Sequence, residues 1–491
     1  MTILVEGPAW GVAGVSGSIV RNPLRVENVI FNVVDRLVPG VISTTPHARY
    51  LSLHGLIRSE AERRGLSTSE ARDLTRRCEA VTAAISHHHE HHRVVIPEAH
   101  GQSRITGLLG KDGSLVVAEA SSVGRYSEAA SGFYGTYRGP EVALGVVSDG
   151  ADQVPGDRYQ DKMVRPVLGE IFVLADSEVL SAHDLQEAAH LCPCAADGSE
   201  AEWLRGIICG WAGGEAHAVK DEARRSTAQI IARTIGASSV PIEKLATKVR
   251  ADISFGPPLG GGAYAGIEAA EAWRGLMLRN HSVGAWRNLW SWIVEELTEP
   301  HSARAIGDVL ASKLPGDWKV ADLIGHLQPG TESGLLMPVE DELRGAVPSP
   351  DPLTELKLLA AGARRLDEID GRALAVLAGD GADDLGPLWV RAELEANGDR
   401  PLRSWASDLV GRLLLRSQRI AMLKLDVSNP LAPRLPAQVI ERDGIWHKQM
   451  SAGSGEPGMR ISRLMSMMAG AGALGHDGQS WWLTASGEAL L

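Results

Sequence analysis

The stretch SLHGLIRSEAERRGLSTSEARDLTRRCEAVTAAI, residues 52–85, decides the fold class because it predicts successive amphipathic helices. Apolar residues recur in it at helical spacing, and charged residues fill the opposite face. Ser67 precedes the second helical run and Glu70 stands three positions later, which is the pattern of a helix-starting capping box. Glu60 and Arg64 are spaced to pair along one helix face. The stretch therefore favours a mainly α protein.

Working outward, the same helical texture covers residues 25–85 and returns after residue 165, whereas residues 94–147 differ. Short β-prone runs such as EVALGVV alternate there with Gly-rich segments, so we expect a mainly α fold with a small β-containing subdomain. A chain of 491 residues also exceeds what one core supports. We expect a mixed helical domain with the β-containing insert at 1–175, a helical segment at 176–255, a helical domain at 256–425 and a C-terminal domain at 430–491.

The composition is that of an ordinary globular protein, with 44% hydrophobic and 22% charged residues. Four cysteines in so long a chain do not make a disulfide framework, which favours the reducing cytoplasm. The N-terminal segment lacks a basic leader and is interrupted early by Glu6, Gly7 and Pro8, so we expect no secretory signal. No apolar run is long enough for a membrane span. A cytoplasmic protein without a membrane partner is expected.

The tail GMRISRLMSMMAGAGALGHDGQSWWLTASGEALL, residues 458–491, predicts a helix, a small-residue break, a turn, a strand and a final short helix. QVIERDGIWHKQ, residues 438–449, predicts a strand and turn just upstream. This order, with its DG, LT and G ending, resembles the recognition helix and wing of winged helix-turn-helix domains. The resemblance covers about the last 60 residues. It implies that 430–491 forms a compact winged helix.

The resemblance also implies a double-stranded DNA partner. From residue 401 onward the chain holds 10 basic and 7 acidic residues, a net of +3, whereas the rest has 39 and 54, a net of −15. Cations on a recognition helix read bases and flanking cations meet phosphates. An exposed tryptophan can stack on a base, and one ring of Trp481 and Trp482 is expected to be exposed. The expected DNA-binding residues are Arg442, Lys448, Arg460, Arg463 and Trp481. Docking of another protein is the alternative, because the net charge is modest.

The stretch ISHHHEHHRVV, residues 85–95, is a first candidate metal site. On a helix, His87 would share a face with His91, and His88 with His92, a spacing that can hold zinc. The zincin pattern beginning at His89 fails because Arg93 stands where its second histidine is needed. A solvated helix end is therefore the favoured interpretation of this run.

The stretch HDLQEAAHLCPCAAD, residues 183–197, is a second candidate, because His183, His190, Cys192 and Cys194 could complete a tetrahedral zinc site. Its Cys-x-Cys spacing is tighter than that of most structural zinc sites, and no second cysteine pair follows. The alternative is a buried cysteine at the end of a helix, where a free thiol behaves as a small hydrophobe. Zinc is the one cofactor that the sequence suggests.

The body of the chain resembles large uncharacterised proteins of bacterial anti-phage defence operons. The stretches that carry this resemblance are TTPHARYLSLHGLI (44–57), GFYGTYRGPE (132–141) and HLCPC (190–194) with Glu202 downstream. The resemblance implies a biological setting and no particular activity. We therefore expect a non-enzymatic, DNA-contacting or scaffolding subunit of a bacterial multi-protein system, with other protein subunits as partners. The alternative is a metal-dependent nuclease or hydrolase that uses either histidine-containing stretch.

Overall fold

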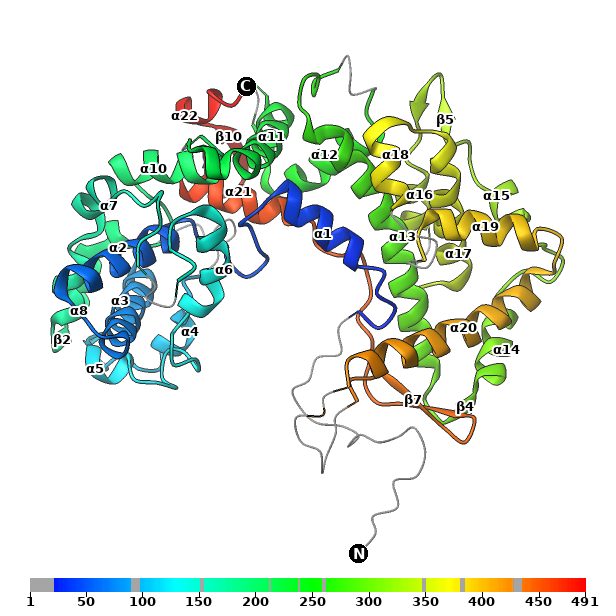
Figure 1. The fold of residues 1–491 in the computed structure, drawn as a ribbon, viewed down its shortest axis with the longest axis horizontal. Coiled ribbons are helices and arrows are strands. Elements are labelled where there is room, and N and C mark those ends of the chain that lie inside the picture. Colours follow the sequence, from blue (N-terminus) through cyan, green and yellow to red (C-terminus); the bar gives the residue numbers. More distant parts are fainter. Residues whose placement is uncertain are drawn as a thin grey trace, which may run out of the picture. The chain divides into compact units, whose positions relative to one another are not determined.

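The computed structural model describes residues 22–89, 98–150, 154–211, 213–236, 239–257, 262–346, 350–379, 385–425, 427 and 435–491 (Figure 1). Helices make up 59% of it and strands 7%, in small sheets, so the expected mainly α fold with a little β-structure is confirmed. None of the described helices combines the length and the apolar character that crossing a bilayer requires.

The chain forms two compact units, each assembled from several segments. Unit 1 comprises Met1–Val33, Ala251–Leu259 and Glu271–Gly458, and unit 2 comprises Val34–Arg250, Gly260–Ala270 and Met459–Leu491. These units do not follow the four ranges expected from the sequence. In particular, the range 430–491 is divided after Gly458, so its two predicted hairpins belong to different units.

Unit 2 is a helical body that contains the stretch of residues 52–85 with which the fold class was predicted. Ser67 and Glu70 form the expected capping box at the start of the second helix of that stretch. The helices lying wholly or largely in unit 2 are α2 (Arg49–Arg64), α3 (Thr68–His88), α4 (Gln102–Ile105), α5 (Val117–Ala120), α6 (Tyr134–Leu144), α7 (Asp161–Leu168), α8 (Ile171–Asp176), α9 (Ala182–Glu187), α10 (Gly198–Ile208), α11 (Ala218–Ile235), α12 (Ile242–Phe255), α21 (Ile461–Gly470) and α22 (Ala485–Glu488).

The regular structure in the described part of the expected β-containing insert is mainly three helices, α4, α5 and α6, joined by turns. In its described part, strand β1 is only Leu115–Val116, and EVALGVV lies largely in α6. One face of α6 buries Tyr137, Glu141 and Leu144, and this packing outweighs the β-propensity of its valines. Strand β1 pairs antiparallel with β2 (Val179–Leu180), which lies outside the expected range. The run VVIP lies outside the described residues.

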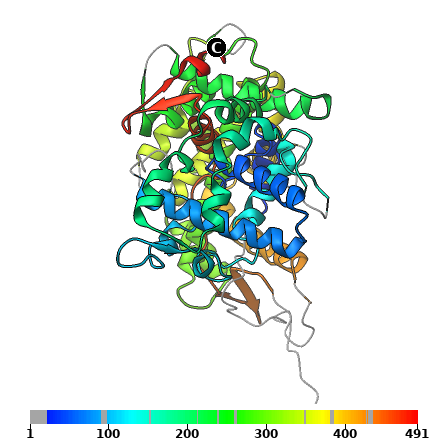
Figure 2. The same ribbon diagram turned by 90° about the vertical axis from the view of Figure 1, so that its left-hand side faces the viewer.

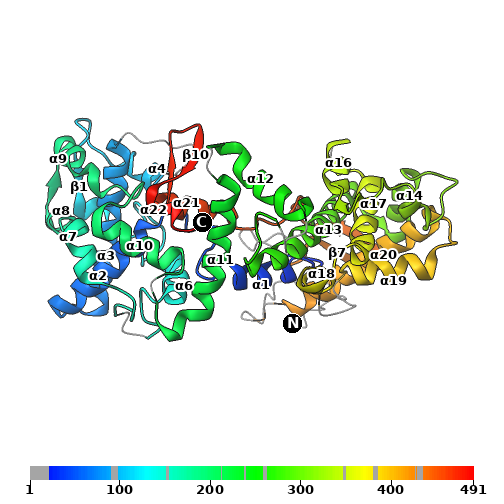
Figure 3. The same ribbon diagram turned by 90° about the horizontal axis from the view of Figure 1, so that it is seen from above.

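A second sheet of unit 2 joins segments that are far apart in the sequence. Its strands are β3 (Val240–Pro241), β9 (Leu474–His476) and β10 (Ser480–Leu483), all antiparallel, in the order β3-β10-β9. The red β9–β10 hairpin can be seen at the upper left of Figure 2. In Figure 3, α21 and α22 lie beside α11 and β10. The helix, strand and short helix expected within 458–491 are therefore present.

Unit 1 is built around the long helix α13 (Ala269–Glu296), whose Trp273, Trp286 and Trp290 are fully buried. Helix α1 (Asn28–Leu37), near the start of the described chain, begins in unit 1 and ends in unit 2. The other helices of unit 1 are α14 (Ala303–Ser312), α15 (Asp322–Gly325), α16 (Val339–Ala346), α17 (Pro352–Arg364), α18 (Gly371–Ala378), α19 (Pro387–Asn397) and α20 (Leu402–Leu423).

The main sheet of unit 1 has the same arrangement as the β3-β10-β9 sheet. Its strands are β4 (His301–Ser302), β7 (Val439–Arg442) and β8 (Ile445–Lys448), antiparallel in the order β4-β8-β7. Asp443 and Gly444 form the β7–β8 turn, both with positive φ, which is the conformation that Asp-Gly hairpin turns adopt. A separate two-stranded hairpin consists of β5 (Thr331–Glu332) and β6 (Leu335–Leu336).

Gly210 is a position of unit 2 where only glycine fits. Its φ is +77°, and an added Cβ would lie 2.1 Å from the carbonyl oxygen of Asp221. We expect Gly210→Ala to lower the free energy of unfolding by at least ~3 kcal/mol, from backbone strain and displaced backbone together. Gly65→Ala is the matched control, because Gly65 has φ +64° with open space around it and should cost only ~1 kcal/mol. Equal urea midpoints for the two variants would contradict this prediction.

Candidate functional site

The three sequence stretches that carry the defence-protein resemblance meet around α2. Residues 44–57 supply its first half, and from there Arg49 contacts the backbone of residues 190–194. One turn later, His54 contacts Glu141 at the end of the 132–141 stretch. This convergence identifies the surroundings of α2 as the candidate functional site.

Arg49 is held in place by a buried carboxylate. Its guanidinium pairs with Glu200 of α10: Nη2 and Nε donate to Oε2 at 2.7 and 3.0 Å, and Nε is also 3.2 Å from Oε1. Both side chains are almost fully buried. The same guanidinium donates to the carbonyl oxygens of His190 at 2.5 Å and Cys192 at 2.9 Å. Burial raises the pKa of Glu200, while the charge of Arg49 opposes that rise. Arg49 therefore fixes the backbone that carries the cysteines.

His54 bridges two buried carboxylates. Its Nδ1 lies 2.5 Å from Glu141 and its Nε2 2.8 Å from Glu79 of α3, with all three side chains inaccessible to solvent. Glu79 also accepts hydrogen bonds from the Tyr126 hydroxyl at 2.6 Å and from the Phe133 backbone N–H at 2.8 Å. Every contact of this group is with protein, so it joins α2, α3 and α6 from inside.

The electrostatics of this group favour a protonated His54. Burial by itself would lower its pKa, but the negative charges and hydrogen bonds of Glu141 and Glu79 outweigh burial and raise it to about 9. His100 is stacked on Phe133 nearby, and burial lowers its pKa to about 4 although the charge of Glu79 opposes that shift. Aromatic side chains enclose His54; Tyr134 and Tyr137 contact its ring edge to face, and Tyr50 stacks on Tyr137.

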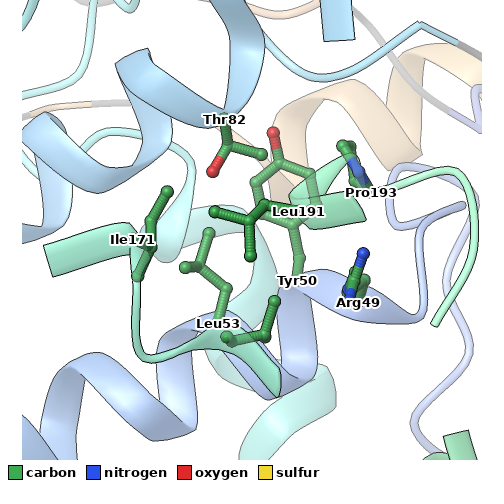
Figure 4. A pocket seen from close by; sticks show the side chains of 8 residues that line it. Arg49, Tyr50, Leu53, Thr82, Ile171, Leu191 and Pro193 are labelled. Carbon is green, nitrogen blue, oxygen red and sulfur yellow. The ribbon is translucent and has the colours of Figure 1, made fainter. Parts of the chain in front are cut away.

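A small cavity lies beside Arg49 and Tyr50 (Figure 4). Leu191 and Pro193 of the cysteine-bearing segment line it, together with α2, α3 and α8 side chains. Its volume is about 10 Å³, enough for a single water molecule and too small for a substrate. The cavity is mainly apolar in its lining, so it does not by itself suggest chemistry.

The potential metal ligands gather at the C-terminal end of α3. His89, Cys192 and Cys194 place one ligand atom each within 4.8 Å of one another. The Cys194 Sγ lies 3.6 Å from Nδ1 of His89. A hydrogen bond from Cys192, helped by the positive charge of Arg49, lowers the pKa of Cys194 to about 7, whereas the same bond and burial raise that of Cys192. Among the residues that the structure describes, these three form the group that could hold a metal ion.

The structure therefore combines parts of the two candidate metal sites in a way that the spacings did not predict. His183 lies 3.4 Å from Glu187 and His190 lies 3.2 Å from Glu170, both exposed and outside the cysteine group. His87 contacts the Thr106 hydroxyl, and His88 the Gly113 carbonyl oxygen, each at 3.2 Å. The remaining expected histidines, His91 and His92, lie outside the described residues.

Two of the five expected DNA-binding residues, Arg460 and Lys448, form ion pairs within the protein. Arg460 pairs with Asp35 and donates to the Val41 carbonyl oxygen at 3.0 Å. Lys448 pairs with Glu295 at 2.6 Å. Arg463 is half-buried and Arg442 is exposed. As expected, one tryptophan of β10 is buried and one exposed, but Trp481 is the buried ring, at 3%, and Trp482 the exposed one, at 38%.

Comparison with known proteins gives no relative: no family model matches the chain, and neither does any curated protein or any solved structure. The function has to be argued from the residues and their geometry.

Proposed function

We propose that this chain is a non-enzymatic scaffolding subunit of a bacterial multi-protein system, built on two winged-helix-like modules. In a winged helix, a short strand between the first two helices pairs with the hairpin that follows the third. The observation that carries the proposal is that this strand order occurs twice, as β3-β10-β9 and as β4-β8-β7.

The first of these, the outer module, lies mostly in unit 2. Its elements follow the order helix, strand, helix, helix, hairpin, and they are α11, β3, α12, α21, β9 and β10. Trp481 pairs with both Val240 of β3 and His476 of β9, which places β10 in the middle of the sheet. The helix expected to read DNA, α21, corresponds to the third helix.

The inner module has the same element order and lies in unit 1. Its elements are α13, β4, α14, α20, β7 and β8. Trp446 of β8 pairs with both His301 of β4 and Glu441 of β7, so β8 takes the central place that β10 has in the outer module. In sequence, the inner module is inserted between the second and third helices of the outer one. Residues 430–491 thus contain the hairpins of both modules.

The surroundings of α21 favour protein docking over DNA reading. Every residue of α21 from Leu464 to Gly470 is buried. The helix packs on α10, where Arg205 donates to the Ala471 carbonyl oxygen at 3.1 Å. A helix that reads DNA has to present a side-chain face to the major groove. Winged helices also serve as protein-docking modules, and a net charge of −12 fits that use better than DNA binding.

A measurement of DNA duplex binding distinguishes a protein-docking role from a DNA-reading role. We expect fluorescence polarisation of a labelled duplex with the full chain to show no saturable binding between 50 and 200 mM salt, because the net charge is −12 and both Lys448 and Arg460 are paired with carboxylates. Arg442→Ala with Arg463→Ala should leave that result unchanged. The scaffolding proposal would be contradicted by saturable binding that weakens as salt is added and whose salt dependence is flattened by these two substitutions. That result would favour a DNA-contacting role.

A positive test uses the native host. We expect the tagged chain to elute in a complex larger than itself, and chemical cross-links to join it to the products of neighbouring genes. Elution as a lone chain would contradict scaffolding, and chelator-sensitive cleavage of DNA or RNA by the purified chain would favour the nuclease alternative. The proposed setting, anti-phage defence, predicts that deleting the gene raises the plating efficiency of phage on that host.

A further inference from the structure

A soft-ligand site lies where the end of α3 meets the segment that follows α9. His89 is the first residue after α3, and its backbone N–H still donates to the Ile85 carbonyl oxygen. Cys192 and Cys194 follow a 3₁₀ turn at Ala188–Leu191. From these positions the imidazole and the two thiols converge within 4.8 Å. We infer that His89, Cys192 and Cys194 bind one zinc ion; this inference is independent of the proposed scaffolding role.

The spacing of the ligand atoms suits a tetrahedral ion. Zinc binds cysteine sulfur at about 2.3 Å and histidine nitrogen at about 2.0–2.1 Å. At a tetrahedral angle these bond lengths put sulfur and nitrogen roughly 3.6 Å apart. The Cys194 Sγ and the His89 Nδ1 are separated by 3.6 Å, which matches this spacing.

The chemistry of the ligands selects the metal. Two thiolates and one imidazole are soft or borderline ligands, which zinc accepts and which magnesium and calcium do not favour. The three residues leave a fourth tetrahedral position for a solvent molecule or an added ligand. Cys192 is 1% exposed, whereas His89 and Cys194 are half-buried, so the group is partly accessible to solvent through these two residues.

The backbone around the group is fixed before any metal binds. Arg49 donates to the Cys192 carbonyl oxygen at 2.9 Å and is anchored by buried Glu200. Pro193 restricts the backbone between the two cysteines. Outer contacts that hold ligands in position commonly change metal affinity by about 10–100-fold when removed. A bound ion would tie together segments whose ligands stand 105 residues apart in the sequence.

Elemental analysis of the full chain, purified under reducing conditions, tests the inference. We expect about one zinc per chain, removable by chelator and restored by zinc alone. Cys192→Ser with Cys194→Ser, and separately His89→Asn, should reduce the zinc content to background. His183→Asn with His190→Asn is the matched control and should retain it, because these histidines lie outside the group. Zinc lost from this control and kept by His89→Asn would overturn the ligand assignment.

A second measurement avoids variants that fail to fold. Cobalt added to the chelator-treated chain should give a thiolate-to-cobalt charge-transfer band. Bound zinc should protect Cys194 from alkylation, and chelator should remove that protection, whereas buried Cys78 and Cys209 should remain unreactive in both states. A reduced, folded chain that takes up neither metal, or a Cys194 equally reactive with and without zinc, would overturn the inference.

Discussion

Glu200→Leu is expected to lower the free energy of unfolding by about 3–5 kcal/mol, because it leaves the Arg49 guanidinium buried and without its carboxylate. The pair is almost inaccessible to solvent, at 3% and 0% side-chain exposure, so water cannot compensate for the loss. Leucine keeps much of the side-chain volume, which limits any additional cost of a cavity. The urea midpoint of the full chain, with hydrogen exchange to locate the loss in unit 2, measures the effect.

A double-mutant cycle separates the ion pair from the other bonds of Arg49. Arg49→Met in the Glu200→Leu background removes the unpaired charge and should recover part of the stability. Recovery should be incomplete, because the carbonyl oxygens of His190 and Cys192 lose their donor. The exposed pair Arg400–Asp408 is the control, and Asp408→Ala should cost under about 1 kcal/mol. A similarly small cost for Glu200→Leu would show that the buried pair is not needed.

The sequence indicated two residues of the proposed metal site, Cys192 and Cys194, but not the histidine that lies beside them. Cysteines two positions apart are a visible local pattern, whereas the histidine that joins them is 105 residues from Cys194. His183 and His190 were expected because they are near in sequence. His183 lies in α9 and His190 in the 3₁₀ turn that follows, and both are exposed beside Glu187 and Glu170. One local pattern did point to His89: the His89–Glu90 pair begins the incomplete zincin pattern.

The fold was predictable to the extent that it depends on local patterns. Helical periodicity indicated the mainly α class, the Ser67–Glu70 capping box and the helix-to-hairpin order of the tail. Strands β3 and β4 have two residues each and no recognisable alternation of apolar and polar residues, so the sequence could not predict the third strand of either sheet. For the same reason the sequence showed the tail as one module, although its hairpins complete two sheets.

Alkaline pH is expected to destabilise unit 2 through His54. The pKa of this imidazole is raised to about 9 in the folded chain, against about 6.5 for an unfolded histidine. The stabilisation is therefore complete below about pH 6.5 and is lost as the pH rises through 9. This difference between the folded and unfolded pKa values corresponds to a stabilising free energy on the order of 3 kcal/mol. Burial also raises the pKa of Glu141, and a raised carboxyl pKa likewise makes stability fall with increasing pH.

The groups that face His54 do not reverse this sign. Burial raises the pKa of each surrounding tyrosine, so these phenols stay neutral over the same interval, and His100 loses its proton at a much lower pH. Burial also lowers the pKa of Arg58 from its ordinary value near 12.5; a depressed pKa of a base by itself makes stability rise with pH, so Arg58 opposes the decline from His54 and does not add to it. The charged and titratable neighbours are Glu79, Glu141, Arg58, His100, Tyr50, Tyr126, Tyr134 and Tyr137.

Urea midpoints of the full chain at pH 6.5, 8 and 9.5 measure the effect. We expect a decline in the wild type and a flatter profile in His54→Gln, whose amide can contact both carboxylates but cannot bind the proton. Glu141→Gln should shift the decline to lower pH, because His54 then keeps one carboxylate, Glu79, at 2.8 Å. A wild-type midpoint that stays constant across this range would show that the cluster holds no extra proton.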